Sequence, residues 1–204
     1  MAKTIAIDLN DVVRDFTRQF KTQYIKHIDP DFEIEDEDII TNDLSEVFPF
    51  DSVNDFNKFL HLDYPYEIFG RAEAVDKMLP YRLNDWIQNT LRDFDEEKIP
   101  NVMFVSPFES NLAIQSTMVF LSKLPSRVRE IYFPIVSATI WDRCDILITA
   151  NPKLLESKPE GKTSIKIQTT YNKDAESDYT FNSLMDVIQD ADSTIINLIE
   201  EDDA

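Results

Sequence analysis

The chain has 204 residues, a net charge of −19 at pH 7 and an apolar content of 43%. This length is enough for one sizeable core, or for a core with a small inserted domain. A charge this negative argues against a protein that grips DNA or RNA through the phosphates, so we expect no direct binding to nucleic acid.

The sequence has no membrane or export signal. No apolar run reaches the roughly 18 residues of a transmembrane helix, and the first residues lead straight into a strand pattern rather than a signal peptide. The single cysteine, Cys144, excludes an internal disulfide, and we expect it to be buried. These features predict a cytoplasmic protein without membrane contact.

The first predicted strand covers residues 3–9 and contains an acid, Asp8, near its end. A helix is predicted from Asp11 to about Lys26, with apolar residues at helical spacing. An acid at the carboxyl end of a buried strand lies where open α/β sheets bind ligands. This start of the chain therefore predicts a functional site at Asp8.

An acidic segment and a block of short helices follow. Residues 29–38 hold seven acids in ten positions, which indicates either a solvated loop or a contact for a basic partner. Ser52 is expected to cap a helix that ends near His61, and Pro80 to open another. We expect the aromatic residues of this block to form a small helical core rather than a platform for bases: Phe48, Phe50, Phe56, Phe59, Tyr64, Tyr66 and Phe69.

From residue 101 onward strands alternate with helices. Strands are predicted at 101–106, 130–133, 145–149 and 164–167, and helices at 110–124 and about 181–199. Such alternation predicts a mostly parallel sheet with right-handed crossovers. We therefore assign residues 1–16 and 100–204 to an α/β core and residues 17–99 to an inserted helical cap.

Four segments resemble motifs of the haloacid dehalogenase (HAD) phosphatases, in particular the 5'(3')-deoxyribonucleotidase branch. The run from Asp8 to Phe16 resembles the first motif, Asp-x-Asp-Gly-Val-x-x-Asp-Phe. Val105-Ser106-Pro107 resembles the second, residues 145–152 the fourth, and residues 161–172 its continuation. The resemblance implies a HAD-like Rossmannoid three-layer α/β core with a parallel sheet and an inserted small helical cap.

The resemblance also implies roles for site residues. Asp8 stands at the position of the nucleophile that forms an aspartyl-phosphate, and Ser106 at that of the hydroxyl that holds the phosphate. Asn10 stands where the family has the aspartate that transfers protons, which an amide cannot do. The family's Gly is Asp11 here.

Two further groups of the family site are replaced. Thr149-Ala150 occupies the position of the acid pair of the fourth motif, so the second magnesium carboxylate is missing. The expected phosphate-binding lysine aligns with Thr139, and the nearby cations that could take its place are Lys123, Arg127 and Arg143. We expect no cofactor or metal; only an active enzyme would bind Mg²⁺, through Asp8 with Asp145 or Asp142. The two histidines, His27 and His61, lack metal-ligand spacing.

We therefore predict a catalytically inactive HAD-fold protein with a structural or interaction role in a larger oligomeric assembly. By analogy with nucleotidases of phage genomes, the specific hypothesis is a bacteriophage virion or accessory protein. Its partner would be a protein with a basic surface, contacted through residues 29–38 and 200–203. Two alternatives stay open: a Mg-dependent nucleotidase with a rearranged site, and a nucleotide-binding protein without turnover.

Overall fold

The computed structural model describes residues 2–91, 99–107, 109–124, 128, 130–190 and 194–200. Its centre is a six-stranded sheet in which all neighbouring strands are parallel, in the order β3-β2-β1-β4-β5-β6. The strands are β1 (Thr4–Asp8), β2 (Asn101–Val105), β3 (Glu130–Tyr132), β4 (Ile146–Thr149), β5 (Thr163–Ile167) and β6 (Tyr179–Phe181). The predicted parallel α/β sheet is confirmed, and β6 is a strand that the sequence pattern did not indicate.

Eight helices and several single turns surround the sheet in the described part of the chain. The helices are α1 (Phe16–His27), α2 (Leu44–Val47), α3 (Val53–Lys58), α4 (Leu79–Asp85), α5 (Asn111–Ser122), α6 (Pro152–Glu156), α7 (Leu184–Gln189) and α8 (Ile195–Glu200). The short turns are η1 (Asp36–Asp38), η2 (Phe59–Asp63), η3 (Tyr66–Gly70), η4 (Trp86–Thr90), η5 (Ser137–Ile140) and η6 (Thr170–Asn172). None of these helices is long and apolar enough to cross a membrane.

Local signals position several helices. The Ser52 side chain accepts a hydrogen bond from the Asp55 N–H and so caps α3, as predicted. Pro80 lies in the first turn of α4. The helix predicted from Asp11 begins only at Phe16, because Asp11 adopts a left-handed backbone conformation (φ 57°) that a right-handed helix cannot contain.

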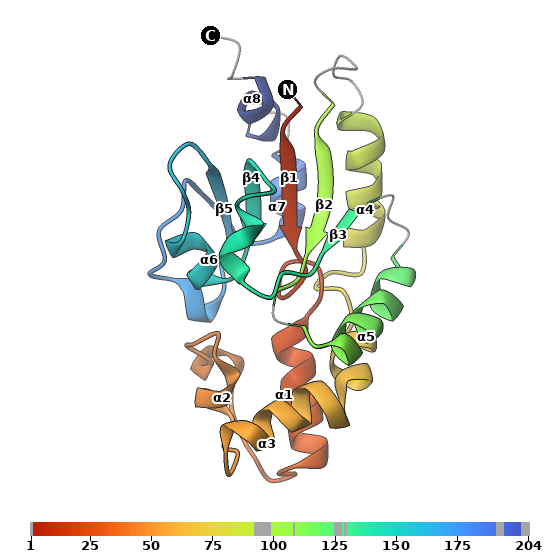
Figure 1. The fold of residues 1–204 in the computed structure, drawn as a ribbon, viewed down its shortest axis with the longest axis vertical. Helices are drawn as coiled ribbons and strands as arrows, with labels where there is room; N and C mark the ends of the chain where they lie inside the picture. Colours follow the sequence, from red (N-terminus) through yellow and green to blue (C-terminus); the bar gives the residue numbers. More distant parts are fainter. Residues whose placement is uncertain are drawn as a thin grey trace.

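Three hydrophobic clusters organise the described residues into a sheet layer and a cap. The first packs helices α4, α7 and α8 against the sheet, and a smaller one packs α6 and η5 against it. The third joins α1 to the turns between residues 32 and 69, and Figure 1 shows α1, α2 and α3 beyond the carboxyl ends of the strands. Of the predicted aromatic core residues, Tyr66 is instead 45% exposed.

Helix α4 belongs to the sheet layer, although it lies within the segment 17–99 expected to form the cap. Its Leu79 and Leu83 are fully buried and belong to the first cluster, and α4 packs against α7. The reason is the apolar face that continues to Trp86 and needs a large apolar surface to cover it.

Candidate functional site

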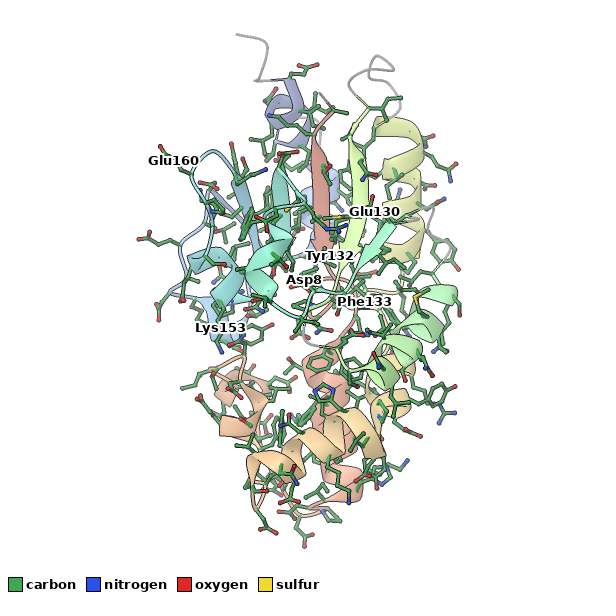
Figure 2. All side chains as sticks on the ribbon, viewed as in Figure 1. Asp8, Glu130, Tyr132, Phe133, Lys153 and Glu160 are labelled. Atoms are coloured by element: carbon green, nitrogen blue, oxygen red, sulfur yellow. The ribbon has the colours of Figure 1, made fainter. Side chains whose placement is uncertain are left out.

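A cleft of about 320 Å³ lies where the cap meets the carboxyl edge of the sheet. The predicted site residues Asp8 and Asn10 line this cleft, and Ser106 lies directly beside it. They come together because β1 lies next to β2 in the parallel sheet and the two strands end at the same edge. Figure 2 shows Asp8 at the end of β1 and Lys153 on the α6 side, next to the cap. The polar side chains that line the cleft include Asp8, Asn10, Asp11, Asn42, Asp43, Asn57, His61, Glu109, Asn151 and Lys153.

Asp8 lies at the floor of the cleft and is 2% exposed. Its Oδ2 accepts a hydrogen bond from the Thr149 hydroxyl (2.7 Å), and its Oδ1 faces the Asn10 N–H (3.4 Å). Burial raises the pKa of Asp8 from 3.8 to about 7, although these hydrogen bonds act in the opposite direction. At neutral pH the carboxyl group is therefore divided between its protonated and ionised forms.

Asn10 is held by the side chain of Arg14. The Nε of Arg14 donates to Asn10 Oδ1 (3.1 Å), and Nη2 donates to the same oxygen. Because a guanidinium group has only donors, it fixes the oxygen side of the amide toward itself and turns the Asn10 Nδ2 group away. The position that holds a proton-transferring acid in active relatives thus presents an N–H donor.

Arg14 is fully buried and joins the cap to the sheet layer. Its Nη2 forms an ion pair with Glu109 Oε1 (2.8 Å), and the two side chains are 0% and 1% exposed. Its Nη1 donates to the Thr117 hydroxyl (2.6 Å) on α5 and to the Phe69 carbonyl (3.4 Å) in the cap. The sequence analysis missed this residue, and the available signal was a cation six positions after the strand-end acid.

Ser106 follows β2, as expected for the phosphate-binding hydroxyl, but its hydroxyl already donates a hydrogen bond within the protein. It is fully buried, and its Oγ donates to Glu109 Oε1 (2.6 Å). Arg14 Nη2 also approaches Ser106 Oγ (3.4 Å). Glu109 Oε1 therefore accepts hydrogen bonds from both the Ser106 hydroxyl and Arg14, the two donors at this place that could otherwise bind a phosphate oxygen.

Asp11 fixes the loop between β1 and α1. Its carboxylate accepts hydrogen bonds from the Thr17 N–H (2.9 Å) and hydroxyl (2.5 Å) and from the Tyr171 hydroxyl (2.8 Å). Burial, with the Asp11 charge next in size, raises the pKa of Tyr171 well above its usual range. These bonds occupy Asp11 as a structural acceptor.

None of the cations expected to replace the family lysine lies among the described residues that line the cleft. Thr139 bonds to Tyr132 and to the Val136 carbonyl. The Arg143 guanidinium lies 4.3 Å from the centre of the Tyr132 ring, and Lys123 donates to the Gly70 carbonyl. Arg127 lies outside the described residues. The cation that does line the cleft is Lys153, which follows the fourth motif.

The residues at the strand ends do not match a magnesium site. Thr149 and Ala150 supply no carboxylate, and the Thr149 hydroxyl donates to Oδ2 of Asp8. Among the described residues no group of three His, Cys, Asp or Glu side chains could hold a metal ion. A hard dication prefers several oxygen ligands, including anionic ones.

The proposed second ligand, Asp145, is excluded by its position. It precedes β4 at the opposite end of the sheet, where it accepts hydrogen bonds from the Thr4 N–H (2.8 Å) and from Lys162 (2.8 Å). Burial raises its pKa, but these partners outweigh that effect and lower the pKa overall. Asp142 also lies outside the cleft lining.

The two histidines and the cysteine have separate surroundings. The His27 ring stacks on Tyr64, with ring centres 4.1 Å apart. His61 lies in the cap, as expected, but also lines the cleft; burial lowers its pKa, and its Nδ1 has no hydrogen-bond partner. Cys144 is buried, and that burial raises its pKa to about 12, which makes it unreactive at neutral pH.

Comparison with known proteins finds similar structures but no similar sequences. No protein-family model and no curated protein matches the chain. Similar solved structures include a haloacid dehalogenase-like family hydrolase of Streptococcus pneumoniae, with a TM-score of 0.57 at 11% identity over 92% of this chain and 97% of that one. Another is the protein YfnB of Bacillus subtilis, described as a HAD-hydrolase, with a TM-score of 0.51 at 10% identity over 92% and 97% of the two chains. The chain therefore has the haloacid dehalogenase-like fold, as the motif resemblance predicted.

Proposed function

We propose that this chain is a HAD-fold protein that does not hydrolyse phosphate esters and uses the cleft for binding. The observation that supports this most directly is the network of Asn10, Arg14, Ser106 and Glu109. In it, the Ser106 hydroxyl and the Arg14 guanidinium donate to Glu109 Oε1 or Asn10 Oδ1, so neither is free to hold a phosphate oxygen.

The proposal follows from what each step of phosphoryl transfer needs. Asn10 cannot exchange a proton near neutral pH, and general acid–base catalysis is worth about 10²–10⁴-fold. The Ser106 hydroxyl and the Arg14 charge are engaged by Glu109, whose own charge repels a phosphate. Without a metal, the transferring group also lacks its main electrostatic stabilisation.

The proposal is tested by phosphate release. The purified protein, with millimolar Mg²⁺, should release no phosphate from deoxynucleoside monophosphates or from p-nitrophenyl phosphate above the level of an Asp8→Asn variant. The variant is the control because it keeps the shape of the side chain and removes the nucleophile. Release that disappears in Asp8→Asn would refute the proposal and favour the Mg-dependent nucleotidase.

An assembly role is a second proposal, which the acidic segment 29–38 supports. Its side chains Asp31, Glu33 and Glu35 are exposed, whereas Phe32 and Ile34 pack against the cap core and hold the segment in place. A fixed acidic surface suits a partner with a basic surface. A bacteriophage virion or accessory subunit would be one such case, by analogy with phage nucleotidases alone.

The assembly proposal is tested on protein isolated from its natural source. Native mass measurement should find it in a complex, and replacement of the exposed acids of residues 29–38 by Ser or Asn should weaken that complex while the melting temperature stays the same. A free monomer, or a complex insensitive to the replacements, would exclude this role.

A further inference from the structure

The cleft is rich in hydrogen-bond acceptors, and this limits what it can bind. Its described lining contains four acids, Asp8, Asp11, Asp43 and Glu109, against one lysine, Lys153, and one histidine, His61. An incoming phosphate brings only further negative charge and acceptors, which such a lining repels. A ligand that brings its own donors would complement it.

One acid at the wall of the cleft lacks a donor. The Glu109 side chain is 1% exposed, and while its Oε1 accepts from Arg14 and Ser106, its Oε2 has no hydrogen-bond partner. A buried carboxylate oxygen without a donor is costly, so a ligand O–H or N–H that reached it would be stabilised. This atom, which the phosphatase chemistry does not explain, points to a ligand that donates.

The same lining also offers donors, which favours hydroxyl groups over ammonium groups. Arg14 turns the Nδ2 group of Asn10 away from itself, and no residue that the structure describes accepts a hydrogen bond from this group. A hydroxyl group can donate to a carboxylate and accept from an amide at the same time, whereas an ammonium group can only donate.

The shape and apolar surface of the cleft agree with a small ring. Its volume of about 320 Å³ is in the range of small-molecule sites. Phe16, Phe56 and Phe69 contribute aromatic surface to the lining from the cap side. Such surface covers the C–H face of a sugar or cyclitol and excludes water from it.

We infer that the cleft binds a small uncharged polyhydroxylated molecule, such as a monosaccharide or cyclitol, rather than a phosphate ester. The inference rests on the proposed non-hydrolytic function and gives the chemical class of its ligand. Carboxylates and amides at the sheet edge bond the hydroxyl groups, and the phenyl rings of the cap contact the ring face.

The test is an amide NMR titration of the full chain with D-glucose, D-ribose and myo-inositol. The matched probes are glucose 6-phosphate and ribose 5-phosphate, which add only the phosphate, and putrescine, which tests the ammonium class. At least one neutral polyol should bind about tenfold more tightly than its phosphorylated form and should shift the signals of the cleft residues. Tighter binding of the phosphate esters, binding of putrescine alone, or no binding of any polyol would overturn the inference.

Variants separate the cleft from the rest of the surface. Glu109→Gln and Asn57→Ala should each weaken polyol binding by about fivefold or more. Glu109→Gln replaces one acceptor oxygen of the carboxylate by an NH2 donor, and Asn57→Ala removes the amide. Asn101→Ala is the control, because Asn101 bonds to Glu130 at the opposite end of the sheet. If Glu109→Gln is too unstable to assay, Asn57→Ala is compared with the control alone, because Asn57 is exposed on the cap. Unchanged binding in Asn57→Ala would overturn the inference.

Phosphate release measured on the same samples keeps the two proposals apart. Hydrolysis of the sugar phosphates would refute the non-hydrolytic function. Absence of both hydrolysis and polyol binding would refute only the ligand class.

Discussion

Asp8 is a buried acid whose ionisation is opposed by its surroundings. Its folded-state pKa of about 7 lies above the value of 3.8 for a free side chain, mainly because burial removes water from the carboxylate. Between these two values the folded protein binds a proton that the unfolded chain does not. The stabilisation from this proton is fully present below about pH 4 and is lost as the pH rises toward 7.

We predict that Asp8→Asn stabilises the protein more at pH 8 than at pH 5, because the amide keeps the shape and carries no charge. The whole pKa shift, from 3.8 to about 7, corresponds to at most about 4 kcal/mol, and the part that falls between pH 5 and pH 8 corresponds to at most about 3 kcal/mol. Urea unfolding of both proteins at several pH values measures it. Asp178→Asn is the control, because the partners Lys158 and Ser164 outweigh burial and lower the pKa of Asp178, which gives the opposite pH dependence. A difference between Asp8→Asn and the parent that does not change with pH would contradict the prediction.

Arg14 and Glu109 are the other residues on which the site depends. Both side chains are removed from water, so each charge needs the other as a partner. Loss of one partner leaves the other charge buried and uncompensated, which is more costly than the loss of the pair.

We predict that Arg14→Met and Glu109→Gln each lower the free energy of unfolding by about 3–5 kcal/mol. The double variant should be less destabilised than the sum of the two by about 1–3 kcal/mol. Chemical denaturation of the four proteins gives this coupling. Arg18→Ala is the control: Arg18 is 74% exposed in its pair with Asp15, and its loss should change stability by less than about 1 kcal/mol. Additive single effects would show that the pair is not coupled.

At the scale of elements, the loop from β1 to α1 determines what the strand end can do. The N–H groups of Val13 and Arg14 both bond to the Leu9 carbonyl, and the Asp11 N–H bonds to the Arg14 carbonyl. This compact turn delays the helix to Phe16 and points Arg14 into the interior. Asp11, which stands where the resembled motif has glycine, adopts a left-handed conformation, and aspartate tolerates this conformation better than most residue types.

We predict that replacements of Asp11 destabilise the protein least for Asn, more for Gly and most for Ala. Asn tolerates the conformation and keeps an acceptor for Thr17 or Tyr171, while Gly loses the acceptor only. Ala loses the acceptor and also adopts a strained φ, for a total loss of about 2–4 kcal/mol. Urea midpoints of the three variants give the order. An Ala variant as stable as the Asn variant would show that neither effect matters at this position.

For the whole molecule, the net charge of −19 sets the response to ions. Like charges at this density repel one another in the compact state, so salts should stabilise it by screening. A specific magnesium site would add stabilisation beyond screening, because a ligand that binds only the folded state shifts unfolding by mass action.

We predict that Mg²⁺ raises the melting temperature no more than Ca²⁺ at equal concentration, and equally in the parent and in Asp8→Ala. The reason is the single carboxylate at the strand ends, already bonded to Thr149. Thermal unfolding in a series of chloride salts provides the measurement. A larger shift with Mg²⁺ that disappears in Asp8→Ala would establish the metal site that we expect to be absent.

The sequence by itself determined the sheet and its functional edge. Apolar runs such as Ile5 to Ile7 and Ile146 to Ile148 are buried on both faces only in a parallel sheet between helices, so the pattern predicts the fold class directly. Acids and hydroxyls that directly follow such runs, as Asp8 and Ser106 do, must come together because parallel strands end at one edge. The resemblance to the motifs added the HAD-like architecture, which the solved structures support at the level of fold.

Only the tertiary structure decided what fills that edge. The ion pair of Arg14 with Glu109 joins residues 95 positions apart, and no local pattern indicates that both side chains are buried together. Hydrophobic periodicity predicts which face of a helix or strand is buried. The pairing of buried charges instead depends on distances between segments far apart in the sequence, and these distances are set only when the chain folds.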